Sequence, residues 1–477
     1  MYRILAQRTP PLLPGRRGRT RLAVVAFALL LAVPAAADPP SSPVSGEVAS
    51  SSTSDDWWLL SAQVTSYAFF LPSFRSPYAN PEVSFGPGPT AGWSFVVSVF
   101  AGARLWEGAF VAVVPEYSNG HGAPNVSGVS GYPDGNMIRV AKVGTAPYFA
   151  RIFLQQDFAI GPPGTDGDEE GPPESRLLPG GPFALRRQRP ASRLSFTFGR
   201  FAMSDFLDAA EVSSDPRHRF LNWALMTQGA WDFAADTRGY TWGLVAALET
   251  PEWALRAAGA LMPTTANGPV FDGDLVNSGS LMVEGEYRWR APSGSGSARL
   301  LGYVNRANMG NYARALAAAP PGTTPVIGSV ARPGTAKYGF GLLVQQDLGP
   351  LGLFFRAGWN DGATETFCFT EIDRSLSAGA SLDGAPWGRP GDAVALGVAT
   401  SGLSSSHAAY LAAGGVGFQL GDGALSYGWE VATEAYYTLR IVKWVELTAD
   451  VQAFWNPGMN AARGPVLLAG LRLHAHI

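Results

Sequence analysis

The feature that most constrains the fold of this chain is a repeated alternation of apolar and polar residues. Downstream of residue 57, segments of about nine residues alternate in this way, and Gly, Pro, Asn and Asp turns separate about sixteen of them. One segment opposes an apolar to a charged face: Leu281, Val283, Gly285, Tyr287 and Trp289 against Met282, Glu284, Glu286 and Arg288. This length and period are typical of tilted strands in a closed transmembrane barrel.

A soluble β-sandwich would show the same alternation, but with its apolar face turned inward. The composition favours lipid contact, because only 15% of the residues are charged, against about 25% in an average soluble domain. Aromatic residues also gather where strands should end, as at membrane interfaces: Trp253, Trp289, Trp359 and Trp444. We therefore expect an all-β fold, a transmembrane antiparallel β-barrel of about 16 strands over 57–477, with short periplasmic turns and long external loops.

The N-terminus has the pattern of a secretory signal peptide. Six arginines flank or precede an apolar run at 22–33, which is too short to span a bilayer, and three alanines at 35–37 form a cleavage site. We expect residues 1–37 to be a signal peptide cleaved before Asp38, and residues 38–56 to be a Pro/Ser-rich flexible lead-in. Export of a barrel places the mature chain in the outer membrane of a Gram-negative cell.

The charge that remains after this cleavage limits the partners. Six of the 35 basic residues and none of the 38 acidic ones lie upstream of Asp38, so 29 basic residues remain and the net formal charge is −9. An acidic chain of this kind is a poor match for nucleic acid. The single cysteine, Cys368, excludes an internal disulfide.

The joins between the expected strands fall into two classes, as in bacterial outer-membrane barrels. Tight joins occur at 106–108, 251, 349–350 and 442–443. Long loops are expected at 117–146, 203–238, 263–278, 307–336 and 360–373. The Pro/Gly-rich segment 161–190 breaks the pattern and predicts an inserted flexible loop, and the spacing of its acidic run matches no calcium site.

The stretch 199–243 mixes tryptophans with charges of both signs between two expected strands, one ending near Phe201 and one beginning near Tyr240. We expect it to narrow a pore, with Asp232, Asp236 and Arg238 at the mouth or eyelet and Trp231 as a stacking surface for a sugar ring. The opposing interpretation is an external loop that is held together by its own Asp–Arg pairs.

The inward faces of the cleanest strands carry both signs of charge in equal number. They are Arg256, Arg288, Arg299, Arg356, Arg440 and Arg472 against Glu284, Glu286, Glu430, Glu434, Glu446 and Asp450. An ion-selective pore would carry an excess of one sign, whereas a balanced lumen suits a neutral polyol that hydrogen-bonds to charged groups. The opposing interpretation is that these ion pairs only brace the barrel wall.

Two sets of side chains form the candidate site. The residues expected to line the pore and bind sugar are Arg200, Asp205, Asp232, Asp236, Arg238, Glu249, Arg256, Glu284, Glu286, Arg288, Arg299, Arg356, Glu434 and Asp450. The rings expected to stack on sugar are Trp231 and Tyr436.

The central stretch also resembles a known family. The segments 215–217, 220–223 and 230–240, with Gly199–Phe201 just upstream, are similar to the signature of the carbohydrate-selective porins of Gram-negative outer membranes, the OprB type. Further matches at 115–120, 131–133, 148–151, 450–452, 456–458 and 463–466 extend the similarity over most of 57–477. The resemblance implies a sixteen-stranded barrel for diffusion of monosaccharides, especially glucose-like sugars. The chain departs from the pattern of many outer-membrane barrels at Ile477, where they end in Phe or Tyr, and 161–190 and 315–332 look like local elaborations.

No pattern in the sequence points to an enzyme. The five histidines, at 121, 218, 407, 474 and 476, lie in no recognisable catalytic or metal motif, and no phosphate-cradling or dinucleotide motif occurs in context. We therefore expect no catalysis, no metal and no cofactor.

The expected partners are small neutral sugars and outer-membrane lipid, and a homotrimer is the assembly common among porins. Two alternatives stay open: a porin for another small solute such as an organic anion, and a structural or partner-binding barrel.

Overall fold

The computed structural model describes residues 57–121, 127–136, 146–161 and 189–477. The expected signal peptide and lead-in lie outside the described residues, as does nearly all of the insertion at 161–190. These three expectations therefore remain predictions.

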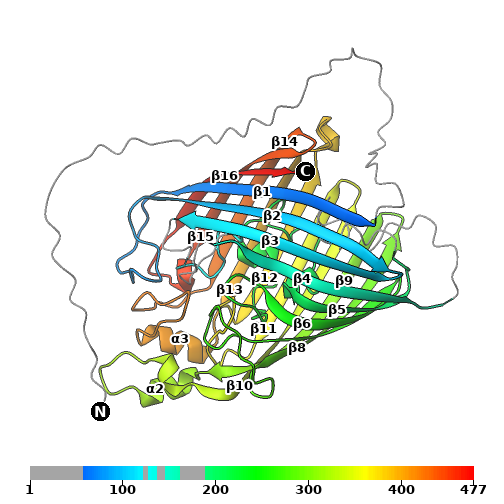
Figure 1. The fold of residues 1–477 in the computed structure, drawn as a ribbon. Coiled ribbons are helices and arrows are strands. Elements are labelled where there is room, and N and C mark those ends of the chain that lie inside the picture. The colour runs from blue at the N-terminus through cyan, green and yellow to red at the C-terminus, as the bar shows by residue number, and fades with distance from the viewer. Residues whose placement is uncertain (1–56, 122–126, 137–145, 162–188) are drawn as a thin grey trace. The chain divides into compact units, whose positions relative to one another are not determined.

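The described strands are antiparallel and close into one barrel, which confirms the expected fold class (Figure 1). Each strand pairs with its neighbours in sequence, and the first pairs with the last, so the barrel has no open edge. A closed barrel is suited to a lipid environment, because every backbone N–H and C=O there must be hydrogen-bonded within the protein. The strands are β1 (Trp58–Leu71), β2 (Thr90–Trp106), β3 (Ala109–His121), β4 (Tyr148–Ala159), β5 (Arg193–Phe201), β6 (Thr241–Glu249), β7 (Trp253–Ala260), β8 (Gly279–Ala291), β9 (Gly294–Met309), β10 (Arg332–Leu348), β11 (Leu351–Asn360), β12 (Arg374–Asp383), β13 (Ala393–Gly402), β14 (Glu430–Val442), β15 (Val445–Trp455) and β16 (Val466–His476).

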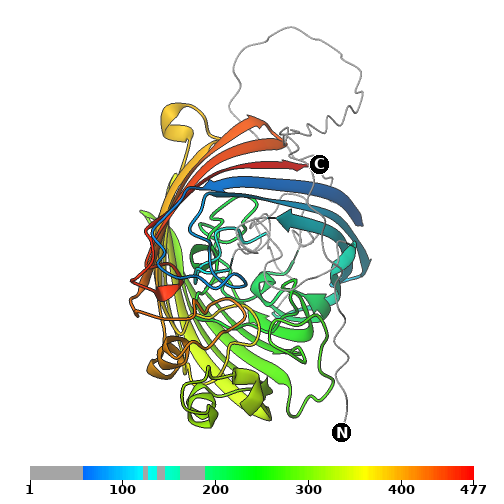
Figure 2. The same cartoon turned by 90° about the vertical axis from the view of Figure 1, so that its left-hand side faces the viewer.

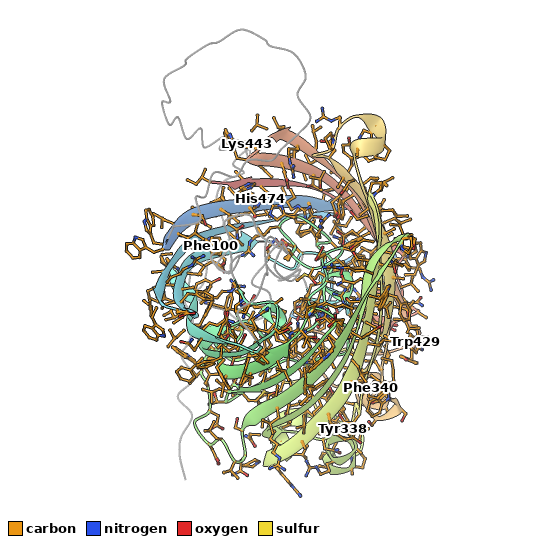
Figure 3. All side chains as sticks on the ribbon, turned by 90° about the vertical axis from the view of Figure 1, so that its right-hand side faces the viewer. Phe100, Tyr338, Phe340, Trp429, Lys443 and His474 are labelled. Atoms are coloured by element: carbon orange, nitrogen blue, oxygen red, sulfur yellow. The ribbon has the colours of Figure 1, made fainter. Side chains whose placement is uncertain are left out.

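Alternate side chains of each strand face opposite sides of the wall. On β7, Leu255 is exposed while Arg256 is buried, and the strand register pairs Arg256 with Glu284 of β8. Apolar and aromatic side chains such as Tyr338, Phe340 and Trp429 project away from the barrel (Figure 3). The outer surface is therefore the lipid-facing one and the charged face is internal, as the alternation predicts.

The joins divide between two ends of the barrel, which we call the short-turn end and the long-loop end. The short-turn end has the joins 107–108, 250–252, 292–293, 349–350, 384–392 and 443–444. The long-loop end has 72–89, 122–147, 202–240, 261–278, 310–331, 361–373, 403–429 and 456–465. The loops at 72–89, 403–429 and 456–465 are not among those expected from the sequence. The join that contains the 161–190 insertion, between β4 and β5, belongs to the short-turn end.

The helices of the described chain are short and lie in the long loops. They are α1 (Trp223–Met226), α2 (Tyr312–Ala318) and α3 (Ser405–Ala412), and Figure 1 shows α2 and α3 together at the long-loop end. Each begins at a side chain that caps a backbone N–H, namely Asn222, Asn311 and Ser404. Among the described residues, no helix is long and apolar enough to cross a membrane.

Candidate functional site

The loop at 202–240, which joins β5 to β6 and which we call the inner loop, folds into the barrel rather than standing outside it. Figure 2 shows coil segments within the ring of strands. Most residues of the inner loop are buried, the others are partly buried, and none is exposed. It hydrogen-bonds to inward-facing side chains from separate parts of the wall, namely Arg356 of β11, Glu434 of β14 and Arg472 of β16. The interpretation of 199–243 as an external loop held by its own ion pairs is therefore wrong.

Arg356 ties the inner loop to β11. Its guanidinium donates to Asp208 Oδ1 at 3.0 Å, to Ser213 Oγ at 2.6 Å and to the carbonyl of Leu225 at 2.9 Å. The backbone N–H of Asp208 in turn donates to Glu284 at 2.7 Å. One arginine of the wall thus joins three separate parts of the inner loop.

Two other charged side chains of the wall hold the opposite side of the loop through its backbone. The Glu434 carboxylate accepts from the N–H groups of Leu221 and Asn222 at 2.7 and 2.8 Å. The Arg472 guanidinium donates to the carbonyls of Pro216, His218 and Arg219, at 2.6 to 3.0 Å. These contacts satisfy buried charges with backbone groups, so their first role is to position the inner loop.

Glycines of the wall make room for the inner loop. A Cβ at Gly358 of β11 would lie 2.1 Å from Gln228 Oε1, and one at Gly341 of β10 would lie 2.7 Å from its Nε2. The Gln228 side chain fills this space and donates to the carbonyl of Ala357 at 3.0 Å. On β13, a Cβ at Gly397 would lie 2.9 Å from Leu225. The close approach of loop to wall therefore requires these glycines.

Asp232 joins the inner loop to the loop at 361–373. It is fully buried, and its carboxylate accepts from the backbone N–H groups of Phe367, Cys368 and Phe369, at 2.9, 2.9 and 3.0 Å. Next to it the rings of Phe233 and Phe369 stack face to face, with centroids 5.2 Å apart. The sequence places Asp232 at an eyelet, but its carboxylate is occupied by backbone donors and is closed to solvent.

A network of ion pairs covers the inner face of β6 to β9. Arg256 lies 2.8 to 3.0 Å from three carboxylates, those of Glu249, Glu284 and Glu286. Arg288 and Arg299 each contact two of the same glutamates. The six charges balance, and all except Arg288 are buried. The arrangement matches the interpretation in which inward ion pairs brace the wall, because each charge is already neutralised by its neighbours.

The two rings expected to stack on sugar are both buried. Trp231 packs against Phe233, with centroids 5.1 Å apart, and is 1% exposed. Tyr436 packs edge-on against Phe220 of the inner loop, with centroids 5.2 Å apart, and is 3% exposed. Neither ring presents an open face in this structure, because both are used to seat the inner loop. Asp450 is likewise engaged, since it accepts from the Tyr67 hydroxyl at 2.8 Å.

The placement of Arg200 corrects the sequence-based expectation. On β5 it shares the strand face of Phe196 and Phe198, which are exposed on the outside of the barrel. The residue is at the long-loop end of the strand, where its guanidinium reaches the carbonyl of Phe149 at 2.9 Å and Asp236 at 2.5 Å. Arg200 therefore braces the rim from the outer face and does not line the lumen.

Inside that rim lies a group of side chains that we call the Glu116 cluster: Glu116, Tyr148, Arg217, Arg238 and Tyr240. Glu116 of β3 accepts from the hydroxyls of Tyr148 and Tyr240 and from the Arg217 guanidinium, the last at 3.1 Å. The Arg238 guanidinium lies over the Tyr148 ring, 3.8 Å from its centroid. Tyr148, Arg217 and Arg238 are partly exposed, unlike the buried network on β6 to β9.

The charge state of the Glu116 cluster follows from its contacts. Burial and the Glu116 carboxylate raise the pKa of the Tyr240 hydroxyl, so it stays protonated and donates. Burial opposes the charged form of Arg217, but Glu116 outweighs it and raises the pKa of the guanidinium. Beside the cluster, Arg151 of β4 pairs with Asp205, through two hydrogen bonds of 2.6 and 2.7 Å. The region therefore combines fixed cations, a carboxylate and aromatic rings.

A second group of buried charges closes the long-loop end. His407 of α3 lies 3.0 Å from Asp373 and 4.0 Å from Glu371, and its ring stacks on Tyr312 of α2, with centroids 4.2 Å apart. Glu371 also accepts from the backbone N–H groups of Gln419 and Leu420. This group joins the loops at 310–331, 361–373 and 403–429. Burial raises the pKa of Glu371 to about 7.

The raised pKa of Glu371 predicts that this closure loosens as the pH rises. The folded state holds the proton more tightly than the unfolded state, whose carboxyl has a pKa near 4.5. Stability is therefore full below about pH 4.5 and falls as pH rises to about 7, by about 3 kcal/mol. Hydrogen exchange at 403–429, corrected for the intrinsic rate, should accelerate between pH 5 and 8 in the wild type. Glu371→Gln should remove that dependence, and an equal acceleration in the variant would contradict the assignment.

The histidines and the cysteine of the described chain show no metal-binding arrangement. Among the described residues, no group of His, Cys, Asp and Glu side chains is placed to hold a metal ion. Cys368 is a buried thiol within the apolar packing around Phe367 and Phe369. Burial raises the pKa of its thiol, which keeps it protonated and unreactive.

A closed sixteen-stranded barrel that spans a membrane and holds a folded, charged loop inside it defines a porin of the outer membrane. The chain belongs to the OprB family of carbohydrate-selective porins, because the model of that family matches residues 101–477. Family and fold both indicate a channel rather than an enzyme, located in the Gram-negative outer membrane.

Solved structures share this fold at low sequence identity. The high-pH structure of Pseudomonas putida OprB superimposes with a TM-score of 0.63 at 16% identity, covering 88% of this chain and 94% of that one. The outer-membrane channel DcaP of Acinetobacter baumannii gives a TM-score of 0.48 at 9% identity, covering 88% and 97%. The first of these likenesses shows the fold alone. No curated protein sequence matches this chain.

Residues of the Glu116 cluster other than Arg238 are absent from the sequence-based site. Glu116, Tyr148 and Arg217 all lie within segments that carry the family resemblance, at 115–120, 148–151 and 215–217. Their position within these segments is the sequence signal that would have identified the three residues. Strand alternation alone would not, because it marks every inward position equally.

Proposed function

We propose that this chain is a passive channel through which glucose-like monosaccharides diffuse across the outer membrane into the periplasm. The observation that carries the proposal is the inner loop, which crosses the lumen and brings Arg217 and Arg238 beside Glu116 and Tyr148. A solute that passes must lose much of its water there, so the groups that replace that water select the solute.

The chemistry of the Glu116 cluster suits a neutral polyol. The guanidinium groups of Arg217 and Arg238 donate to hydroxyl oxygens, and the Glu116 carboxylate accepts from hydroxyl groups. Arg238 covers one face of the Tyr148 ring, and the exposed part of the ring offers an apolar surface to a sugar. Because solute and wall exchange hydrogen bonds without a chemical step, passage needs no energy coupling.

The other residues proposed at the pore act mainly through the loop. Arg356 and Glu434 hold its backbone or side chains, and Asp236 accepts from the backbone N–H groups of Arg238 and Tyr240 at 2.9 and 3.3 Å. We propose that these residues set the position of the guanidinium groups rather than touch sugar.

A channel for organic anions is the second candidate, because arginines gather on the inner side of the rim. Arg151, Arg217 and Arg238 lie there beside Glu116 and Asp205, and their positive charges attract an anionic solute. Swelling of liposomes that contain the purified protein distinguishes the two. We expect glucose to enter faster than gluconate, which has a similar size but carries a negative charge. Faster entry of gluconate would instead favour the anion channel.

A further inference from the structure

A second polar cavity lies at the short-turn end of the lumen, opposite to the Glu116 cluster. Its volume is about 410 Å³, which is within the range of small-molecule sites. The inner loop forms one side of it with Glu211, Val212 and Arg219. The inward positions near the turns of β9 to β12 form the other side with Ser295, Asp347, Ser381 and Asp383.

Glycine lets the inner loop cover this cavity closely. A Cβ at Gly352 of β11 would lie 2.8 Å from the side chain of Val212, and the backbone N–H of Glu211 donates to Gln345 of β10 at 3.2 Å. The cavity is therefore bounded by the same loop that forms the constriction.

The carboxylates of this cavity differ from those elsewhere in the lumen. Glu249, Glu284 and Glu286 are each neutralised by arginines. Within the described parts of the chain, neither Asp347 nor Asp383 forms an ion pair. The one cationic side chain in the lining is Arg219. The lining of the cavity therefore holds more acidic than basic side chains.

Hydroxyl groups complete the lining. Ser295 Oγ lies 3.5 Å from Asp347. Ser381 is 4% exposed, and its hydroxyl lies beside that of Tyr436. A hydroxyl group can both donate and accept, so these serines match the hydroxyl groups of a sugar.

We propose that this cavity is a second, periplasmic sugar subsite that prefers protonated amino sugars over neutral ones. The ammonium group of a 2-amino-2-deoxyhexose pairs with Asp347 and Asp383, while Arg219 and the serines bind ring hydroxyls. The short-turn end faces the periplasm in bacterial barrels, so a solute occupies this subsite after it has passed the constriction. The inference rests on the proposed sugar channel and adds a class of substrate to it.

The test is sugar block of single channels in planar bilayers, with solutes added on the short-turn side at low salt. Glucosamine is compared with N-acetylglucosamine, which has the same ring but no charge. Two exposed carboxylate–ammonium pairs should give glucosamine about fivefold tighter block. The double variant Asp347→Asn, Asp383→Asn should remove most of that preference. Glu252→Gln, at another turn of the same end, should keep it.

The outcomes separate this inference from the proposed function. Equal block by the two solutes in the wild type, or a preference unchanged in the double variant, overturns the amino-sugar subsite. Block by ethanolamine as strong as that by glucosamine also overturns it, because the ring would then contribute nothing. If no sugar reduces the current from either side, the sugar channel itself is wrong.

Discussion

Replacing Asp232 with alanine should release the inner loop from the long-loop end and widen the pore. The carboxylate satisfies three buried backbone N–H groups, those of Phe367, Cys368 and Phe369. Its loss leaves all three without an acceptor, at a cost of about 3 kcal/mol or more in loop stability. The strand ladder does not depend on this contact, so the barrel itself should persist.

Single-channel conductance and sugar block together measure this effect. We expect Asp232→Ala to raise conductance several-fold and to weaken block by glucose, with the β-structure of the barrel retained in circular dichroism. Asp274→Ala removes an exposed carboxylate at the same end of the barrel and should change neither property. An Asp232→Ala channel with wild-type conductance and block would show that this anchor does not hold the loop.

Replacing Arg238 with alanine should weaken sugar block more than it lowers stability. The partly exposed guanidinium lies over Tyr148, whereas the backbone N–H of the same residue holds Asp236 at 2.9 Å. Truncation of the side chain therefore removes a charged donor from the cluster and leaves the turn intact. Loss of a hydrogen bond to a charged group should weaken binding by about tenfold.

Two measurements check this expectation: the glucose concentration that blocks the channel, and the temperature at which each variant unfolds. Arg238→Lys should fall between wild type and Arg238→Ala, because lysine keeps the charge but lacks the planar fork. Arg306→Ala removes an exposed arginine at the same end and serves as the matched control. A lower unfolding temperature with unchanged sugar block would instead assign Arg238 a purely structural role.

The alternation of residues was sufficient to predict which side chains lie inside the barrel. Leu255 and Arg256 show why, since a period of two leaves one neighbour to lipid and sends the other inward. The same rule applied to β5 would have placed Arg200 on the outer face with Phe196 and Phe198. Its assignment to the lumen came from the family motif around it and not from its own strand.

The path of the inner loop could not be predicted from neighbouring residues in the sequence. Its anchors join residues far apart in the chain, as when Asp232 binds the backbone at 367–369 and Arg356 binds Asp208. Each contact depends on closure of the barrel, which brings those strands around one lumen. A list of inward charges therefore does not separate those that hold a loop, such as Glu434, from those that stay partly exposed, such as Arg440.

The ion pairs of the wall also show that a list of inward charges does not reveal what each charge contacts. The balance of inward charge in the sequence predicts a lining for neutral solutes, and the charges on β6 to β9 do balance. They balance through mutual contact, however, with Arg256 in reach of three glutamates. The selective chemistry that we propose lies instead where pairing is incomplete or exposed, at the Glu116 cluster and at Asp347 and Asp383.

Glucose titration of the current through single channels tests the central claim most directly. The purified protein is inserted into a planar bilayer, and conductance is recorded as glucose is added. A passive sugar channel with a narrow, hydrogen-bonding constriction predicts stable conductance that falls with glucose in a saturable manner. Conductance that no glucose-like sugar reduces, or the absence of any conductance, would contradict it.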